Sequence, residues 1–227
     1  MRATRIYPLN DCPAYVSSHK RHPRLEPVWI EPGASELTGP TFERSRGQTI
    51  VDMATHDGGR ALGQRIVVAG HVRDEQGRPV RNTLLEIWQA NAAGRFDHEN
   101  DAHDAPLDPH FHGSGRIFTG DDGEYVFETI KPGAYPWRNH PNAWRPAHIH
   151  FSLFGPSFGT RLVTQMYFPG DPLLALDPIL ASIPDDGARA RMISTYDHGL
   201  SREGYALGFR WDVVLAGRYA TPFENAR

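Results

Sequence analysis

The chain has very little cysteine and no long apolar run. Cys12 is its one cysteine among 227 residues, so a single chain can form neither an internal disulfide nor a metal site built from several thiolates. No run of about 18 apolar residues is present, and the N-terminal sequence lacks the apolar segment of a signal peptide. We therefore expect a cytoplasmic protein that does not enter a membrane.

Positive charge is not in excess either. The chain has 24 lysines and arginines against 27 aspartates and glutamates, which gives a formal net charge of -3 at pH 7. Such a chain offers no basic field to hold the phosphates of a nucleic acid or the head groups of anionic lipids. Nucleic acid is therefore not an expected partner.

Turn-forming residues and histidine are plentiful. The 22 glycines and 19 prolines indicate many turns, and a turn-rich chain of 227 residues fits one large all-β domain better than two small ones. The 12 histidines are a weak indication of a metal site, because imidazole is the commonest metal-ligating side chain.

Short apolar runs bounded by turn sequences predict strands from residue 66 onward. The predicted strands are Ile66–Val72, Thr83–Ala90, Arg116–Thr119, Glu124–Ile130, Ala147–Leu153, Arg161–Phe168 and Tyr205–Ala216. The turns DEQGRP and GDDG predict that the first two strands form a hairpin and that the next two form another. The prediction is an all-β fold, a β-sandwich of mixed or antiparallel strands.

Two parts of the chain do not follow this strand pattern. Residues 1–62 show no sustained periodicity, so we expect an extended N-terminal arm packed on the core or on a partner subunit, with residues 63–227 forming the sandwich domain. The segments Leu173–Ile183 and Ala188–Tyr196 have helical spacing and predict short peripheral helices.

Two histidines share one face of the predicted strand AHIHFSL. Period-two geometry places His148 and His150 on one side and an apolar set on the other. They are either solvent-facing side chains or a pair of metal ligands, and the aromatic and arginine-rich loop before them suits the binding of an aromatic anion. Tyr135 follows a Lys-Pro-Gly turn in that loop. Two imidazoles with a phenolate would favour Fe(III) over Zn(II), because a phenol ionises at neutral pH only beside a strong Lewis acid.

Two other motifs offer alternatives. A second His-x-His pair, His110 and His112, suggests a four-histidine zinc or copper site, although its loop is rich in proline and glycine and gives no strand to direct the imidazoles. The sequence GPSFG at residues 155–159 matches the nucleophile elbow of serine hydrolases. That elbow needs a following helix, whereas a strand-like run follows here, so a hairpin loop is the better interpretation.

Several segments carry motifs that occur together in one enzyme family. They are TLLEIWQANAAG at residues 83–94, Asp108-Pro109, TIKPGAYPW at 129–137, WRPAHIHF at 144–151, and Phe223-Glu224-Asn225. From about Tyr15 to its C-terminus the chain closely resembles the intradiol ring-cleaving dioxygenases, and among them the β subunits that act on protocatechuate. The resemblance implies a β-sandwich subunit paired with a related α subunit.

The resemblance also implies an activity and a site. The activity is cleavage of protocatechuate by O₂ to 3-carboxy-cis,cis-muconate with non-haem Fe(III). His148, His150 and the axial Tyr135 correspond to iron ligands, and Tyr135 is implied to leave the iron and help deprotonate the catechol. Arg145 corresponds to the arginine beside the substrate. The remaining substrate-pocket positions are Trp137, Gln165 and Tyr15, the last near the substrate carboxylate.

One position departs from the family pattern. The family has Gly-Arg-Tyr where this chain has Gly94-Arg95-Phe96, so the second tyrosine ligand is missing. The chain is then either an active dioxygenase with three protein ligands or an impaired homologue kept as a binding or assembly subunit. A further alternative is that His98 or His103 supplies a replacement ligand, although neither stands at the family's ligand position.

Overall fold

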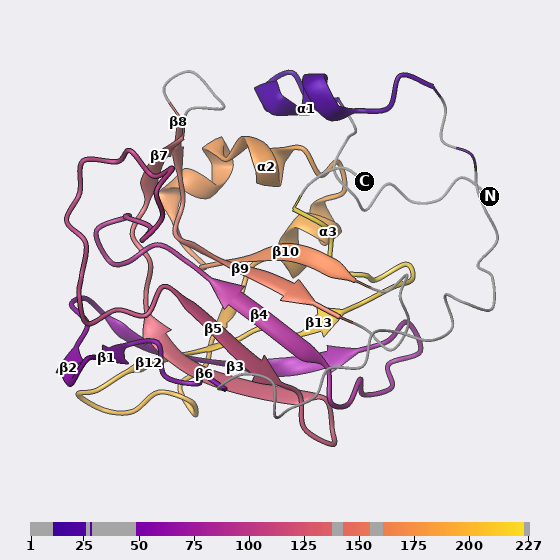
Figure 1. Cartoon of the computed structure of the whole chain (residues 1–227). Helices are drawn as coiled ribbons and strands as arrows, with labels where there is room; N and C mark the ends of the chain where they lie inside the picture. The colour runs from indigo at the N-terminus through magenta and orange to yellow at the C-terminus, as the bar shows by residue number, and fades with distance from the viewer. Residues whose placement is uncertain (1–10, 26–27, 29–48, 138–142, 155–160, 225–227) are drawn as a thin grey trace.

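Two β-sheets pack face to face in the computed structural model, which describes residues 11–25, 28, 49–137, 143–154 and 161–224 (Figure 1). The first sheet has the strand order β10-β9-β4-β5, and its strands are β4 (Leu84–Trp88), β5 (Ser114–Phe118), β9 (His148–Leu153) and β10 (Leu162–Tyr167). The second has the order β11-β12-β3-β13, with β6 also paired to β3. Its strands are β3 (Arg65–Arg73), β6 (Glu124–Ile130), β11 (Thr195–Tyr196), β12 (Leu207–Arg210) and β13 (Val213–Val214).

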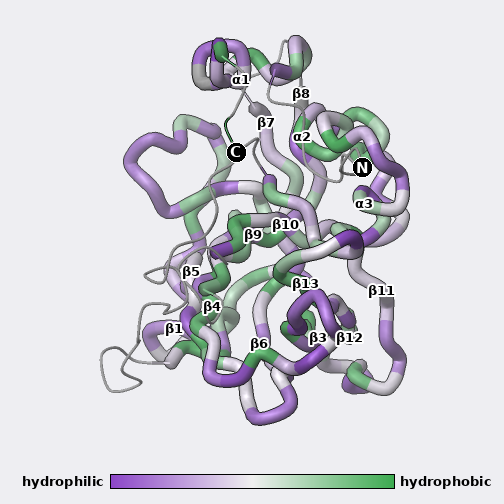
Figure 2. Tube along the Cα trace, turned by 90° about the vertical axis from the view of Figure 1, so that its right-hand side faces the viewer, coloured by the Kyte–Doolittle hydropathy of each residue, from purple (hydrophilic) through white to green (hydrophobic). Residues whose placement is uncertain are grey.

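The main hydrophobic core lies between the two sheets. Alternate residues of β9, Ile149, Phe151 and Leu153, are fully buried there and meet residues of β3 and β6 such as Val68 and Phe127. The strand β3 is apolar almost throughout because it is paired on both sides and buried on both faces. Figure 2 shows this concentration of hydrophobic residues along the central strands.

A third layer covers the outer face of the first sheet (Figure 1). It contains the helices α1 (Val16–Arg21), α2 (Pro178–Ala181) and α3 (Asp186–Arg191), the 3₁₀ helix η3 (Pro172–Leu176), and a ribbon of β7 (Tyr135–Trp137) with β8 (Ala143–Arg145). A smaller apolar cluster that includes Tyr167, Leu180 and Met192 joins β10 to α2 and α3. The outward-facing histidines of β9 therefore lie under protein rather than in solvent.

Both predicted hairpins before β9 are wrong. β3 and β4 lie in different sheets, and so do β5 and β6. The turns DEQGRP and GDDG cross between the sheets instead, because β3 pairs with β6 while β4 pairs with β5 and β9. The hairpin of β9 and β10 is confirmed by their antiparallel register, although its loop, which contains GPSFG, lies outside the described residues.

The predicted ends of other elements also need correction. The last predicted strand is divided into β12 and β13, both parallel to β3. The helical segments are shorter than predicted, because Pro178 begins α2 after η3 has ended and residues 195–196 belong to β11.

The segment predicted as an arm is not wholly extended. It contains α1 and the small hairpin of β1 (Thr55–His56) and β2 (Gly59–Arg60), and it places Met53 in the main core. Residues 1–10, 26–27 and 29–48 of this segment lie outside the description. In the part of the chain that the structure describes, every helix is too short or too polar to span a bilayer.

Candidate metal and substrate site

The β7–β8 ribbon brings Tyr135 beside the entry to β9. Tyr135 pairs with Arg145 in the ribbon register, and three positions after Arg145 the chain enters β9 at His148. Asp171 accepts a hydrogen bond from the backbone N–H of Ala147 at 3.0 Å, which fixes this short connection. The ribbon thus delivers the phenol of Tyr135 to the histidine face of the sheet, where its hydroxyl lies 3.2 Å from His148 Nε2.

Cross-strand pairing builds the rest of that face. His150 stands directly opposite Trp88 on β4 and Gln165 on β10, so the three side chains form one row. The Trp88 ring stacks on the His150 ring with centroids 4.9 Å apart and an interplanar angle of 4°. In the next row Tyr167 stands opposite His148, and their ring centroids are 5.8 Å apart.

Each histidine has one ring nitrogen engaged by a fixed acceptor. His148 Nδ1 donates to the carbonyl of Pro146 at 2.7 Å, and His150 Nδ1 donates to a Glu224 carboxylate oxygen at 2.9 Å. Gln165 Nε2 donates to the same oxygen of Glu224 at 2.9 Å. Hydrogen bonds of this kind select the tautomer that leaves a lone pair on Nε2, and they are typical partners of metal-ligating histidines.

Burial keeps His148 and Tyr135 neutral when no cation is bound. Desolvation, together with Arg145 and His150, lowers the pKa of His148 well below its usual range, so the ring stays an unprotonated ligand. Burial raises the pKa of Tyr135 to about 12 despite the opposing charge of Arg145. A phenol with that pKa ionises near neutral pH only when a Lewis acid replaces its proton. The side chains of Tyr135, His148 and His150 therefore suit a hard, highly charged ion such as Fe(III).

Phe96 lies against this donor set. Its ring meets that of Tyr135 edge-on, with centroids 5.2 Å apart at 83°, and lies 6.3 Å from the His150 ring. The preceding Gly94 adopts a φ of 77°, and a Cβ added there would clash with the carbonyl oxygen of Ala134 beside Tyr135. The position that the resemblance gives to a second tyrosine is thus beside the donor set, but it is apolar.

A cavity of about 690 Å³ opens next to these residues. Tyr135, His150, Trp88 and Phe96 line it together with His98 and with residues 100–104, among them His103. His103 Nδ1 lies 3.0 Å from the carbonyl oxygen of Gly94. Within the described ranges, neither of these two histidines joins His148 and His150 in a compact group of metal-ligating atoms.

The guanidinium of Arg145 is fully buried and already paired. It forms an ion pair with Asp177, with Nε 3.0 Å from Oδ1, and it also donates to Gln165 and to the hydroxyl of Tyr167. Burial acts to lower the pKa of Arg145, but Tyr167 and Asp177 outweigh burial and raise it above its ordinary value. The pair of Arg145 and Asp177 is neutral as a whole, so Arg145 provides a fixed dipole near the site rather than a free positive charge.

Tyr15 contacts Trp137, which in turn lies beside Arg145. Tyr15 is the N-terminal cap residue of α1 and is 7% exposed, and its ring lies 5.0 Å from that of Trp137. The guanidinium of Arg145 lies 5.4 Å from the centroid of Trp137. The predicted substrate residues Tyr15, Trp137, Arg145 and Gln165 thus form one chain of contacts. None of them belongs to the described lining of the 690 Å³ cavity.

The structure adds Asp177, Glu224, Tyr167 and Trp88 to the site. Tyr167 packs in the smaller apolar cluster, and its hydroxyl in addition lies 2.7 Å from Asp177 and 3.0 Å from Arg145. Glu224 was visible only as part of a motif. Its partner His150 is 74 positions away, so no local pattern could connect the two.

The alternative four-histidine site is not formed. His112 packs edge-on against His56 with ring centroids 5.2 Å apart, and His110 Nδ1 lies 3.1 Å from the carbonyl oxygen of His56. His148 and His150 contact Tyr135, Trp88 and Glu224 instead. Within the described ranges the two His-x-His pairs do not come together as one group of metal ligands.

Comparisons with known proteins identify the family of this chain. A family model described as Dioxygenase matches residues 37–217. The protocatechuate 3,4-dioxygenase beta chain of Burkholderia cepacia is 55% identical over 220 residues, which cover 94% of this chain and 92% of that protein. This chain belongs to the intradiol ring-cleaving dioxygenases.

Other dioxygenases are similar at lower identity. The protocatechuate 3,4-dioxygenase alpha chain of Pseudomonas putida is 32% identical over 165 residues, covering 72% of this chain and 77% of that one. The solved structure of 3-chlorocatechol 1,2-dioxygenase from Rhodococcus opacus 1CP superposes with a TM-score of 0.56 at 25% identity, covering 80% of this chain and 72% of that chain. The β-sandwich of this chain is therefore the fold of these dioxygenases.

Proposed function

We propose that this dioxygenase binds Fe(III) through Tyr135, His148 and His150 and cleaves protocatechuate with O₂ between its two hydroxyl-bearing carbons, giving 3-carboxy-cis,cis-muconate. The observation that carries the proposal is the convergence of a phenol and two imidazoles whose Nδ1 atoms are held by Pro146 and Glu224. The high identity to a beta chain and the similarity to an alpha chain support a complex with a related α subunit.

Each residue of the proposed site has its own role in the reaction. Fe(III), when bound, supplies the redox chemistry that lets a catechol react with O₂. Bound to that ion, Tyr135 would be a phenolate. The phenolate oxygen would then accept a proton from an incoming catechol hydroxyl, because burial raises the pKa of the phenol to about 12 and favours its protonated form. Trp88 stacks on His150 and limits access of water to that ligand. Arg145, held by Asp177, presents a buried dipole near the substrate, and Tyr15 with Trp137 forms the wall proposed to meet its carboxylate.

The α/β complex provides the direct test. We expect about one iron per β chain and consumption of one O₂ for each protocatechuate cleaved, measured by elemental analysis, an oxygen electrode and product absorbance. His148→Ala and His150→Ala should each abolish bound iron without unfolding the chain, because the opposite face of β9 carries the core. Iron retained at full stoichiometry in both variants would refute the ligand assignment.

A second candidate function rests on Phe96. With an apolar ring beside Tyr135, the chain would be an impaired homologue that acts as a binding or assembly subunit. A complex that assembles with the α subunit but contains no iron and consumes no O₂ would establish this function instead.

Two further proposals concern the whole chain. Residues 1–62 act as an arm on the catalytic domain, residues 63–227. The enzyme works in the cytoplasm.

A further inference from the structure

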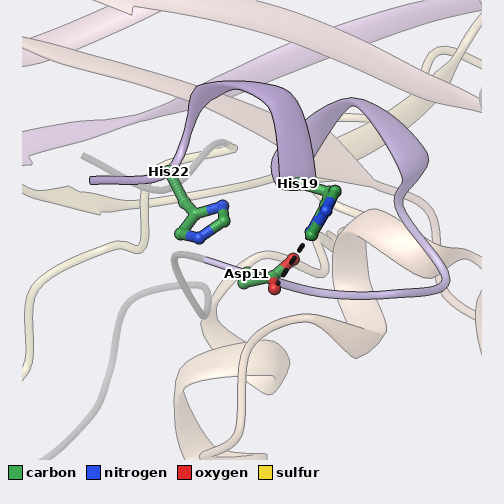
Figure 3. Close-up of side chains that lie close together, drawn as sticks. All are labelled: Asp11, His19 and His22. Atoms are coloured by element: carbon green, nitrogen blue, oxygen red, sulfur yellow. Dashed lines mark hydrogen bonds and ion pairs between the residues drawn. The ribbon is translucent and has the colours of Figure 1, made fainter. Parts of the chain in front are cut away.

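Three metal-ligating side chains meet at the N-terminal helix, outside the proposed iron site. Asp11, His19 and His22 each offer one ligand atom, and these atoms lie within 4.8 Å of one another (Figure 3). Asp11 and His19 are exposed and His22 is half-buried. We propose that they form a second metal site, one that takes a divalent transition-metal ion of the Zn²⁺ type.

The helix α1 and the loop before it bring the three residues together. His19 lies on α1 and His22 directly follows it, three positions later, so both project from one side of the helix. Ser18 ties the preceding loop to the helix, because its hydroxyl accepts from the N–H of Cys12 at 2.8 Å and lies 2.9 Å from the Cys12 carbonyl oxygen. Asp11 is therefore held over the histidines by contacts that do not depend on a metal.

The donor atoms have suitable spacing and direction. His19 Nδ1 and an oxygen of Asp11 are 3.4 Å apart, close to the separation of two donors on one ion with bonds of about 2.0–2.2 Å. His22 Nδ1 lies 3.3 Å from the carbonyl oxygen of Ser18. In the tautomer that donates this hydrogen bond, Nε2 of His22 keeps a lone pair for a metal, as at other histidine-ligated sites.

An ion pair alone does not account for the arrangement. An exposed pair such as His19 with Asp11 stabilises a protein little, and the second imidazole is not needed for it. Two protonated rings with centroids 5.5 Å apart would repel each other, whereas two neutral rings and a carboxylate attract one divalent cation. The donor set of two nitrogens and one oxygen favours zinc-like ions over Ca²⁺ and Mg²⁺, which prefer oxygen ligands, and water can complete the coordination.

The site encloses the turn that carries Tyr15. Asp11 stands four positions before Tyr15 and His19 four positions after it, while the Tyr15 ring is buried against Trp137. A metal bound by Asp11 and His19 would close a link across this turn. We therefore expect metal binding to make local unfolding of residues 11–22 less frequent.

Calorimetric titration of the iron-loaded α/β complex with Zn²⁺ tests the site. Wild type should bind one more Zn²⁺ per β chain than the variant His19→Ala/His22→Ala, and Asp11→Asn should weaken that binding at least tenfold. His198→Ala, which removes an exposed histidine elsewhere, is the matched control and should bind as wild type does. Iron content should be equal in all of them.

Hydrogen exchange gives a second readout. Zn²⁺ should slow amide exchange in residues 11–22 of wild type and His198→Ala, and it should leave exchange in the double variant unchanged. Equal Zn²⁺ binding by wild type and the double variant would overturn the proposal, and so would slowed exchange at residues 11–22 in both.

Discussion

Phe96 packs edge-on against Tyr135 and brings no oxygen to the donor set. We expect Phe96→Tyr to bind iron more tightly by about tenfold or more, to deepen the tyrosinate colour and to raise kcat, because a second phenolate would add an anionic ligand. Iron affinity by chelator competition, visible absorbance and O₂ uptake measure the three effects.

Phe111→Tyr is the control for this change. It adds the same hydroxyl to a half-buried ring that packs on the main core, next to His110 in the sequence, and Phe111 is not among the residues that line the cavity beside Tyr135. If Phe96→Tyr leaves colour, iron content and kcat as they are in Phe111→Tyr, residue 96 does not reach the metal.

Glu224 orients His150 through the hydrogen bond at Nδ1. Burial acts to raise the pKa of Glu224, but hydrogen bonds from His150 and Gln165 outweigh it and hold the pKa below its usual value, so the carboxylate is ionised. Glu224→Gln should therefore weaken iron binding about 10–100-fold while leaving the fold intact. Glu86→Gln, at a surface pair with Arg116, should leave the iron affinity unchanged. Equal iron affinity in both variants would exclude an orienting role.

Single residues were predictable from the sequence where the local pattern was sufficient. Period-two alternation placed His148 and His150 opposite the core residues of β9, and the structure confirms that division. Asp177 was not predictable, because it meets Arg145 from 32 positions away and only the docking of α2 onto the sheet brings the two together. Whether the proposed ligands hold iron stays a prediction.

The loop before Phe96 depends on the backbone of Gly94. Gly94→Ala should destabilise the protein by more than the roughly 1–2 kcal/mol of a left-handed alanine, because the new Cβ would displace Ala134 beside Tyr135. Gly77→Ala is a matched control with a φ of 79° and open space around its Cβ. Urea unfolding should give a larger loss for Gly94→Ala, with lower iron content in that variant alone, and equal losses would contradict the argument.

The helix α2 is joined to the β7–β8 ribbon by the buried pair of Asp177 and Arg145. Asp177→Asn keeps the capping acceptor for Ile179 N–H but leaves Arg145 unpaired, so we expect a loss of about 3–5 kcal/mol of unfolding free energy. Asp185→Asn changes the equivalent cap of α3, which accepts from Ala188 N–H, and should cost much less. Similar urea midpoints for the two variants would show that the ion pair contributes little.

Strands were predictable as elements, but their partners were not. The apolar runs of β3, β4, β6 and β9 follow from composition and alternation. The turn sequences after β3 and β5 show only that the chain reverses, and in a sandwich a reversal can lead to the facing sheet as well as to the neighbouring strand. Pairing was decided by the packing of two apolar faces, which no short segment contains.

At the scale of the whole molecule, preference for an anionic substrate must come from local groups. The chain has a net charge of -3, and the buried Arg145 is balanced by Asp177, so neither gives a long-range attraction for a carboxylate. A charge-assisted hydrogen bond near Tyr15 would contribute about 1.5–3 kcal/mol, which corresponds to roughly tenfold to a hundredfold in kcat/KM. We therefore expect the α/β complex to prefer protocatechuate over catechol by that factor, and Tyr15→Phe to reduce the preference without changing the rate with catechol. Steady-state kinetics with both substrates measures the preference as a ratio of kcat/KM values. A wild-type complex that prefers plain catechol would show that the pocket carries no carboxylate contact.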